Sequence, residues 1–241
     1  MRVTLSRCAT VRTSLLRILA LGATWFAAEP SCVRSSAPKG PSQEKSHEAG
    51  PVTPLPAADI KGQPLLQLLQ RRHTSREFAT SQIDAQTLSN LLWAAYGVNR
   101  PDGKRTAPSG HDWQYIDVYV TDSSGIYRYE AKKQQLVLSK SGDLRSKTGP
   151  QDFAATAPVS LIYVNDARKF PQGTPDEERL LFGATTAGAI VQNVYLFCAA
   201  NNLNTGVRAD IDRPVLHAAM GLAPEQRILL AQSVGAPPGA K

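Results

Sequence analysis

The sequence predicts an α+β fold with a mainly antiparallel central sheet flanked by helices. A strand pattern over residues 115–121 is followed by two short strand patterns, 126–129 and 135–138, on either side of a polar connection. A continuous apolar run over 158–164 has the length of a buried central strand, and a long helix pattern covers 176–202. Strands and helices are therefore mixed without the regular alternation that produces a parallel sheet.

The strand over 115–121 has two distinct faces. Apolar residues point one way and the others point the opposite way, with Ile116, Val118 and Val120 against Asp117 and Tyr119. This alternation is the period of a strand with a different environment on each face. A further strand is expected over 228–234.

Shorter helices are predicted on both sides of these strands. Residues 64–69 place three leucines on one helical face, and Asp84 is a suitable N-cap for a helix that Gly97 ends. A helical turn is expected over 153–156, and Pro214 begins a short helix that ends at Gly221.

The long helix over 176–202 begins with three acidic residues, which suit the positive end of a helix dipole. Its middle, 184–200, is small and apolar almost all round, so we expect it to be buried. Gly183 and Gly188 would let a second backbone approach closely, as in a domain core or a subunit core.

The chain divides into three parts by composition. Residues 1–28 have a basic start, a short apolar stretch and small residues at its end, which is typical of a secretory signal. Residues 29–58 are rich in Pro, Ser, Ala and Gly and predict a disordered linker. Residues 59–241 have a usual size for one domain.

The leader predicts an exported or periplasmic protein, with a cytoplasmic location if it is not a functional signal. A mitochondrial-type leader, a disordered leader or a start codon placed too early would give a similar pattern. The apolar stretch is too short for a comfortable membrane span, so no transmembrane segment is expected there.

Charge and motif content exclude several function classes. Four of the seven net positive charges come from arginines of the leader, so the remainder is only mildly basic and no nucleic-acid partner is predicted. No histidine pairs with another His or Cys at zinc-ligand spacing, so no metal site is predicted. The common nucleotide-binding, hydrolase, zinc-protease and thioredoxin motifs are missing from the sequence.

The stretch Arg72–Phe78 is the most informative part of the sequence. It places two arginines, a hydroxyl and an imidazole within five residues, directly after a predicted helix. Guanidinium groups present planar pairs of donors that match two phosphate oxygens at once. The stretch therefore indicates an anion site, although a solvated basic helix end has the same composition.

Three segments together resemble the nitroreductase family of flavin mononucleotide (FMN) enzymes, including its branch of SagB-type dehydrogenases. They are RHTSREF at 72–78, APSGHDWQ at 107–114 and GAIVQNVYLFCAANNLNTG at 188–206. The resemblance covers about residues 62–235. It departs from the family pattern in having Thr74 for Ser and Asn202 where Gly is common.

The resemblance implies a set of cofactor-binding residues. Arg72 and Arg76 would supply charge for the phosphate and the pyrimidine side, with Thr74 as a hydroxyl partner and His73 beside it. In the second segment the implied residues are Pro108, Ser109, Asp112 and Gln114; in the third, backbone groups of Gly206, Arg208 and Ala209 would approach the ring.

Two further departures concern the contacts to the cofactor. Asp112 stands where the family often has Asn, and a carboxylate accepts hydrogen bonds but cannot donate one. Basic residues that family members often carry near the C-terminus are missing, apart from Lys241. The phosphate would then depend on Arg72 and Arg76, with Lys104 or Arg105 as additional candidates.

The resemblance also implies the activity: an FMN-dependent oxidoreductase that passes hydride through flavin N5 from NAD(P)H or another donor to a small nitro compound or quinone. No protein acid or base is required, so no catalytic residue is named. The implied assembly is an intertwined homodimer with the flavin at the subunit junction. The alternatives are a SagB-type oxidase or dehydrogenase of peptide heterocycles and an exported flavin-binding protein without turnover.

Overall fold

The fold is described from a computed structural model, in which residues 50–59 and 62–239 are described. The predictions for the leader at 1–28 and for linker residues 29–49 lie outside this part of the chain. Within it, seven strands form one sheet in the order β1-β4-β3-β2-β5-β7-β6, and every neighbouring pair is antiparallel. The strands are β1 (Val52–Pro54), β2 (Ile116–Thr121), β3 (Gly125–Glu130), β4 (Gln135–Ser141), β5 (Val159–Asp166), β6 (Asn204–Arg208) and β7 (Gln226–Gly235).

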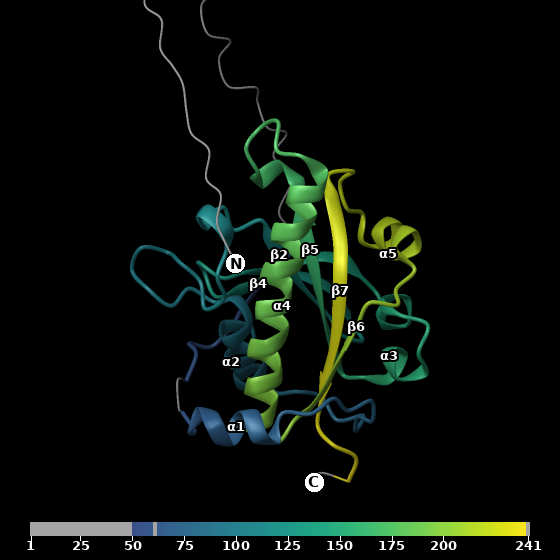
Figure 1. The fold of residues 1–241 in the computed structure, drawn as a ribbon. Helices are drawn as coiled ribbons and strands as arrows, with labels where there is room; N and C mark the ends of the chain where they lie inside the picture. Colours follow the sequence, from purple (N-terminus) through teal and green to yellow (C-terminus); the bar gives the residue numbers. More distant parts are fainter. Residues whose placement is uncertain (1–49, 60–61, 240–241) are drawn as a thin grey trace, which may run out of the picture. The chain divides into compact units, whose positions relative to one another are not determined.

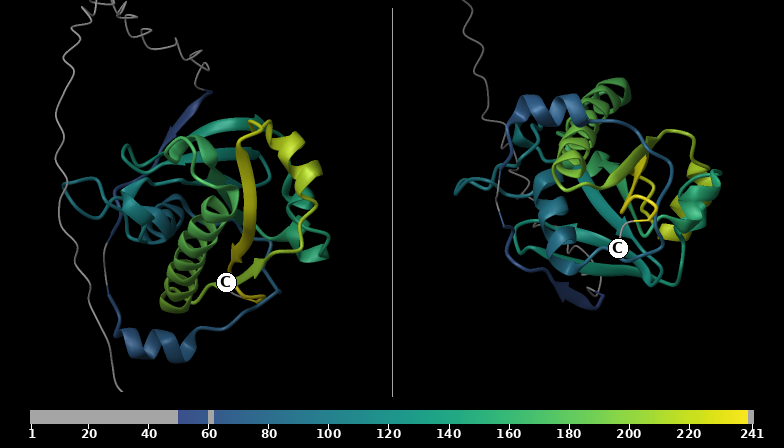
Figure 2. Two further views of the ribbon diagram at one scale, coloured as in Figure 1. Left: turned by 45° about the horizontal axis from the view of Figure 1, so that its top comes forward. Right: turned by 90° about the horizontal axis from the view of Figure 1, so that it is seen from below.

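Helices cover both faces of this sheet, which confirms the α+β prediction. They are α1 (Leu65–Arg71), α2 (Ala85–Tyr96), α3 (Asp152–Thr156), α4 (Asp176–Ala200) and α5 (Arg213–Met220), with short 3-10 turns η1 (Gly110–Asp112), η2 (Arg145–Thr148) and η3 (Ala167–Lys169). In Figure 1, α2 and α4 lie on one side of β7, and α3 and α5 lie on the other. Figure 2 shows the same arrangement from two further directions.

Each face of the sheet has its own apolar core. The core under α2 and α4 contains Ile116, Val118 and Val120 of β2, whereas the core under α5 contains Tyr119. The two faces predicted for this strand are therefore confirmed. Every residue of β5 is buried, as predicted for a central strand.

Local signals position the helices as the sequence predicts. The Asp84 carboxylate accepts a hydrogen bond of 2.9 Å from Thr87 N and caps α2. Gly221 ends α5 with a left-handed backbone (φ 66°) that glycine adopts without a steric penalty.

Two edge strands were not predicted. β1 lies within the predicted linker and pairs with β4 from Val52 to Pro54, so ordered structure begins before residue 58. The boundary of the linker is thus wrong, because a three-residue strand has no periodic signal of its own. β6 follows α4 after a tight turn and pairs with β7, a contact that depends on tertiary structure.

The prediction that the middle of α4 is buried all round is wrong for one stripe. Ile190, Val194 and Cys198 are buried against the sheet and α2, whereas Ala184, Thr185 and Gly188 are exposed in the single chain, as is Leu181 one turn earlier. α4 is long and apolar enough to cross a membrane, but core helices share this composition, and α4 packs on β2, β5, β6 and β7.

α1 also presents an apolar surface to solvent. Leu68 is buried, but Leu65, Leu66 and Leu69 are 57%, 79% and 44% exposed. The described chain therefore has uncovered apolar residues on two helices that contact each other.

Candidate functional site

The first and third motif segments lie side by side. Residues 72–79 run along the free edge of β6, where Ser75 N donates to Thr205 O (2.9 Å) and Asn204 Nδ2 donates to Glu77 O (2.7 Å). Two segments more than a hundred residues apart in the sequence thus form one surface at the edge of the sheet.

Tyr195 of α4 joins these two segments. Its hydroxyl shares a hydrogen bond of 2.8 Å with Thr74 Oγ1 and accepts one of 3.2 Å from Val207 N. The guanidinium carbon of Arg72 lies 5.3 Å from the centre of the Tyr195 ring, within the range of a cation–π interaction. We call Arg72, Thr74, Tyr195 and Val207 the Tyr195 cluster.

Tyr195 was not among the predicted site residues. In the sequence, Tyr195 is a phenol within an otherwise apolar helix, and a buried tyrosine hydroxyl needs a hydrogen-bond partner. This mismatch was the available sign that Tyr195 contacts another segment. The segment that supplies the partner is remote in sequence, so the pattern alone could not assign the contact.

Replacing Tyr195 with phenylalanine should lower the free energy of unfolding by about 1–3 kcal/mol, because Thr74 Oγ1 and Val207 N lose their shared partner. Urea denaturation followed by circular dichroism measures this change. Tyr127→Phe is a matched control, since the partner of the Tyr127 hydroxyl within the described residues is Ser124 at an exposed turn. An equal loss in both variants would contradict a joining role for Tyr195.

Close packing within the chain requires a glycine at position 206. A Cβ at this position would lie 2.8 Å from Ser75 O, so a larger residue would push residues 72–79 away from β6. Gly206 and Arg208 pair with Ser233 and Ala231 of β7. Because backbone groups alternate sides along a strand, the free edge presents Val207 instead, with Ala209 directly after the strand.

Arg208 extends its side chain into the protein. It is 5% exposed, donates from Nη2 to Thr148 Oγ1 (3.0 Å) and Ser160 Oγ (3.4 Å), and lies over the Phe153 ring. Its Nε and Nη1 atoms are buried and have no hydrogen-bond partner among the described residues. Burial lowers the pKa of the Arg208 guanidinium to about 10.

Arg76 and His73 of the first segment face solvent. Arg76 is exposed, and the described part of the chain offers it no hydrogen bond or ion pair. His73 is also exposed, and its Nδ1 lies 3.0 Å from Arg71 O at the end of α1. Arg76 therefore has a guanidinium group that is free to bind a ligand.

The second motif segment, residues 107–114, forms a loop that we call the strained loop. His111, Asp112 and Gln114 have φ angles of 52°, 57° and 51°, a region that side chains other than glycine seldom adopt. Backbone strain of this kind persists only where neighbouring contacts hold it, and it is common at binding sites.

Gln114 supplies several of the contacts that hold the strained loop. Its backbone N donates to Ser109 Oγ (2.9 Å), its Oε1 accepts from Arg105 Nε (2.8 Å), and its Nε2 donates to Gly103 O (3.2 Å) and Asp112 Oδ1 (3.1 Å). The amide is therefore occupied within the chain, which indicates a bracing role for Gln114.

The described chain does not bring the strained loop to the Tyr195 cluster. Pro108 O accepts a hydrogen bond of 3.0 Å from Thr186 Oγ1. Thr186 and Tyr195 are separated by about two and a half turns of α4, or roughly 13 Å along its axis. The predicted site residues thus form two separate groups in one chain.

The additional phosphate candidates lie beside the second motif segment and not at the Tyr195 cluster. Lys104 forms an ion pair with Asp102 (3.2 Å), and Arg105 donates to Gln114 and to Tyr96 O (3.2 Å). Arg72 and Arg76 remain as the cations beside the Tyr195 cluster.

Comparison with known proteins identifies the family. The sequence profile of the Nitroreductase family matches residues 69–236, so the chain belongs to this family and is an oxidoreductase of its type. A crystal structure of a protein assigned as a nitroreductase from Ralstonia eutropha has 40% identity, covers 78% of this chain and 90% of its own, and has a TM-score of 0.74.

Two further relatives are more distant. A Methanocaldococcus jannaschii protein assigned as a nitroreductase is 26% identical over 166 residues, which is 65% of this chain and 83% of that protein. The Escherichia coli microcin synthetase McbBCD complex contains a chain with 16% identity and a TM-score of 0.58, covering 88% of this chain and 84% of that one. The second similarity shows a shared fold.

Proposed function

We propose that this protein is an FMN-dependent oxidoreductase that passes electrons from NAD(P)H to a small acceptor such as a quinone or nitro compound. The observation that carries the proposal is the Tyr195 cluster, where the arginine motif meets the free edge of β6. Cationic side chains, a hydroxyl and the end of a strand edge occur together there, and this set of groups suits a phosphorylated ring cofactor.

Arg72 and Arg76 would hold the phosphate, because both lie on one segment and neither has a carboxylate partner among the described residues. Thr74 would orient the cofactor while bonded to Tyr195. Val207 N is bonded to Tyr195, so the Val207 carbonyl and the backbone of Ala209 are the edge groups to which the ring would bind. When bound, FMN supplies the centre that accepts and releases hydride.

The strained loop would complete the site from a second subunit. A cavity of about 510 Å³ between α1, α2 and α4 contains none of the predicted cofactor residues, so it does not supply the missing part of the site. Donation of Pro108, Ser109 and Asp112 by a partner would enclose it. This arrangement explains why the two groups of motif residues lie apart.

The uncovered apolar residues support a homodimer. Leu65, Leu66 and Leu69 of α1 and the exposed stripe of α4 would be buried in a subunit interface. An added Cβ at Gly188 would meet nothing within 4 Å in the single chain, so the helix has room there for another backbone. Burial of such apolar surface is the main driving force for stable association.

An absorbance spectrum of the purified protein, before and after anaerobic addition of NADH or NADPH, tests the activity. We expect flavin absorbance that one of the nicotinamides bleaches and that a quinone restores. Flavin that neither bleaches would favour an oxidase or another donor, as in the SagB-type alternative. A colourless protein that FMN cannot reconstitute would contradict the proposal and leave a binding or scaffold role.

A further inference from the structure

The ladder between β2 and β3 stops halfway. The strands pair at Tyr119–Arg128, Val120–Tyr127 and Thr121–Ile126, and β2 continues back to Ile116 while β3 continues to Glu130. Continuing the register would pair Val118, Asp117 and Ile116 with Tyr129, Glu130 and Ala131. All six of these residues instead line a cavity of about 310 Å³, which we call the β2–β3 cleft.

This opening leaves backbone groups without their usual partners. β2 is paired with β5 on its other edge, and β3 is paired with β4 on its other edge. The N–H and C=O groups that face the cleft therefore lack a cross-strand partner, and buried backbone groups of this kind normally bind something. The volume lies at the lower end of the range for small-molecule pockets.

The charges around the cleft favour an anion. Five cations line it, Arg105, Arg128, Lys132, Lys133 and Lys169, against two acids, Asp117 and Glu130. Arg128 Nη2 lies 2.6 Å from Glu130 Oε1, and Lys169 Nζ lies 2.6 Å from Asp117 Oδ1, so each acid is already neutralised. Five cations against two acids leave the cleft with an excess of positive charge, and within the described chain Arg128 meets Glu130 through Nη2, which leaves its other donors for a ligand.

Arg105 contributes to this excess of positive charge from inside the cleft. Its guanidinium is held by Gln114 Oε1 and Tyr96 O and lies over the Tyr96 ring, with no ion pair to a carboxylate among the described residues. Tyr96 is 2% exposed, and its hydroxyl has no hydrogen bond of normal geometry within the described chain. Burial raises the pKa of Tyr96 to about 12, so the hydroxyl stays neutral and can donate.

Part of the cleft wall is apolar. Ile116, Val118, Tyr129 and Ala131 are all buried residues that line it. A ligand suited to the cleft therefore combines a charged oxyanion with a small apolar body.

We propose that the β2–β3 cleft binds a small organic anion, with a carboxylate or phosphate held by Arg128 and Arg105 and an apolar part against Ile116, Val118 and Tyr129. The site is separate from the Tyr195 cluster and does not depend on the proposed flavin chemistry. It would give the protein a second ligand that nothing in the family motifs predicts.

Calorimetric titration of the full chain at low salt, with benzoate and with phenyl phosphate, tests the site. We expect at least one to bind at a single site, and benzamide, which has the same ring without the charge, to bind at least about tenfold more weakly. A preference between the two anions distinguishes a carboxylate from a phosphate ligand. Equal binding of benzamide, or no binding of either anion, would overturn the proposal.

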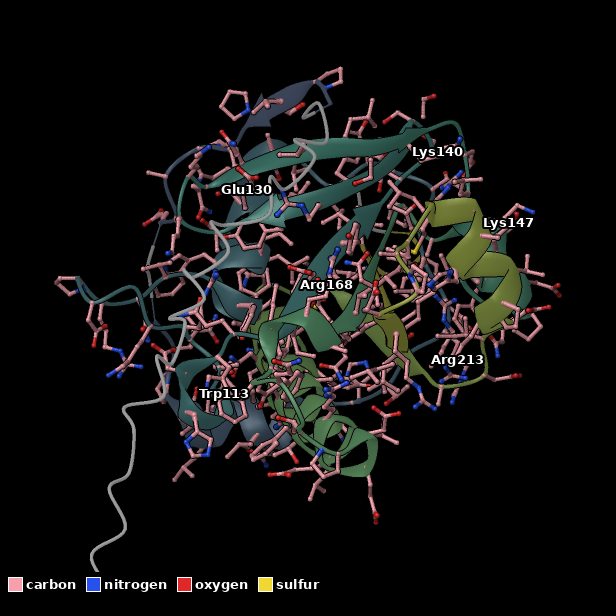
Figure 3. All side chains as sticks on the ribbon, turned by 90° about the horizontal axis from the view of Figure 1, so that it is seen from above. Trp113, Glu130, Lys140, Lys147, Arg168 and Arg213 are labelled. Carbon is pink, nitrogen blue, oxygen red and sulfur yellow. The ribbon has the colours of Figure 1, made fainter. Side chains whose placement is uncertain are left out.

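Charge variants locate the binding. Arg128→Gln should weaken anion binding about tenfold, and Asp117→Asn should strengthen it, because the second change removes a competing carboxylate. Lys140→Gln removes the same charge from an exposed site on β4; Figure 3 shows Lys140 and Glu130 at opposite ends of the β3–β4 pair. Equal effects of Arg128→Gln and Lys140→Gln would indicate only general electrostatic attraction.

A variant that fills the β2–β3 cleft tests the proposal without changing any charge. Ala131→Leu places extra side-chain atoms in the cleft and should abolish anion binding. Circular dichroism and thermal unfolding establish that the variant is folded before titration. A folded Ala131→Leu variant that binds benzoate or phenyl phosphate as well as the unchanged protein would place the ligand elsewhere.

Discussion

Arg76→Ala should lower the affinity of the protein for FMN by about 10- to 100-fold, which corresponds to one or two charge-assisted hydrogen bonds to phosphate. Arg76 is exposed and free of ion pairs within the described chain, so its guanidinium is available to a ligand. Quenching of FMN fluorescence during titration of the apoprotein gives the affinity.

Arg71→Ala is the matched control for this prediction. Arg71 belongs to the same basic stretch, but its Nη1 donates to Gln63 Oε1 (3.1 Å) at the end of α1. We expect this variant to retain FMN as the unchanged protein does. Full flavin affinity in Arg76→Ala would show that Arg76 does not hold the phosphate, and an equal loss in both variants would indicate a general effect of net charge.

Much of the fold could be predicted from local patterns. The alternation of Ile116, Val118 and Val120, the apolar run that becomes β5 and the cap at Asp84 each result from interactions within a few residues. β6 could not be predicted in this way, because it is held by pairing with β7 and by contacts with residues 72–79. Such contacts depend on how distant segments meet.

The candidate site, like the fold, could be predicted only in part. The motifs predict a set of cofactor-binding residues, and the structure brings Arg72, Thr74 and Gly206 of this set to one place. The direction in which each motif side chain points was not predictable, because it depends on which face of its segment packs against the rest of the protein. Arg208 is thus buried over Phe153, and Gln114 is occupied within its own loop.

Gly188→Arg should convert the protein into a monomer, because a long charged side chain would stand in the centre of the proposed α4 interface. The single chain has open space at this position, so the change should leave the fold of each subunit intact. Light scattering coupled to size-exclusion chromatography measures the mass, and circular dichroism measures the folded content.

The same variant should lose FMN, because the strained loop and the Tyr195 cluster would no longer meet across the subunits. Thr156→Arg adds the same side chain to an exposed position of α3 and should change neither mass nor flavin content. A Gly188→Arg monomer with full flavin occupancy would contradict a shared site, because one chain would then hold the cofactor alone. A dimer that survives the change would place the interface away from α4, and the exposed leucines of α1 would become the next surface to test.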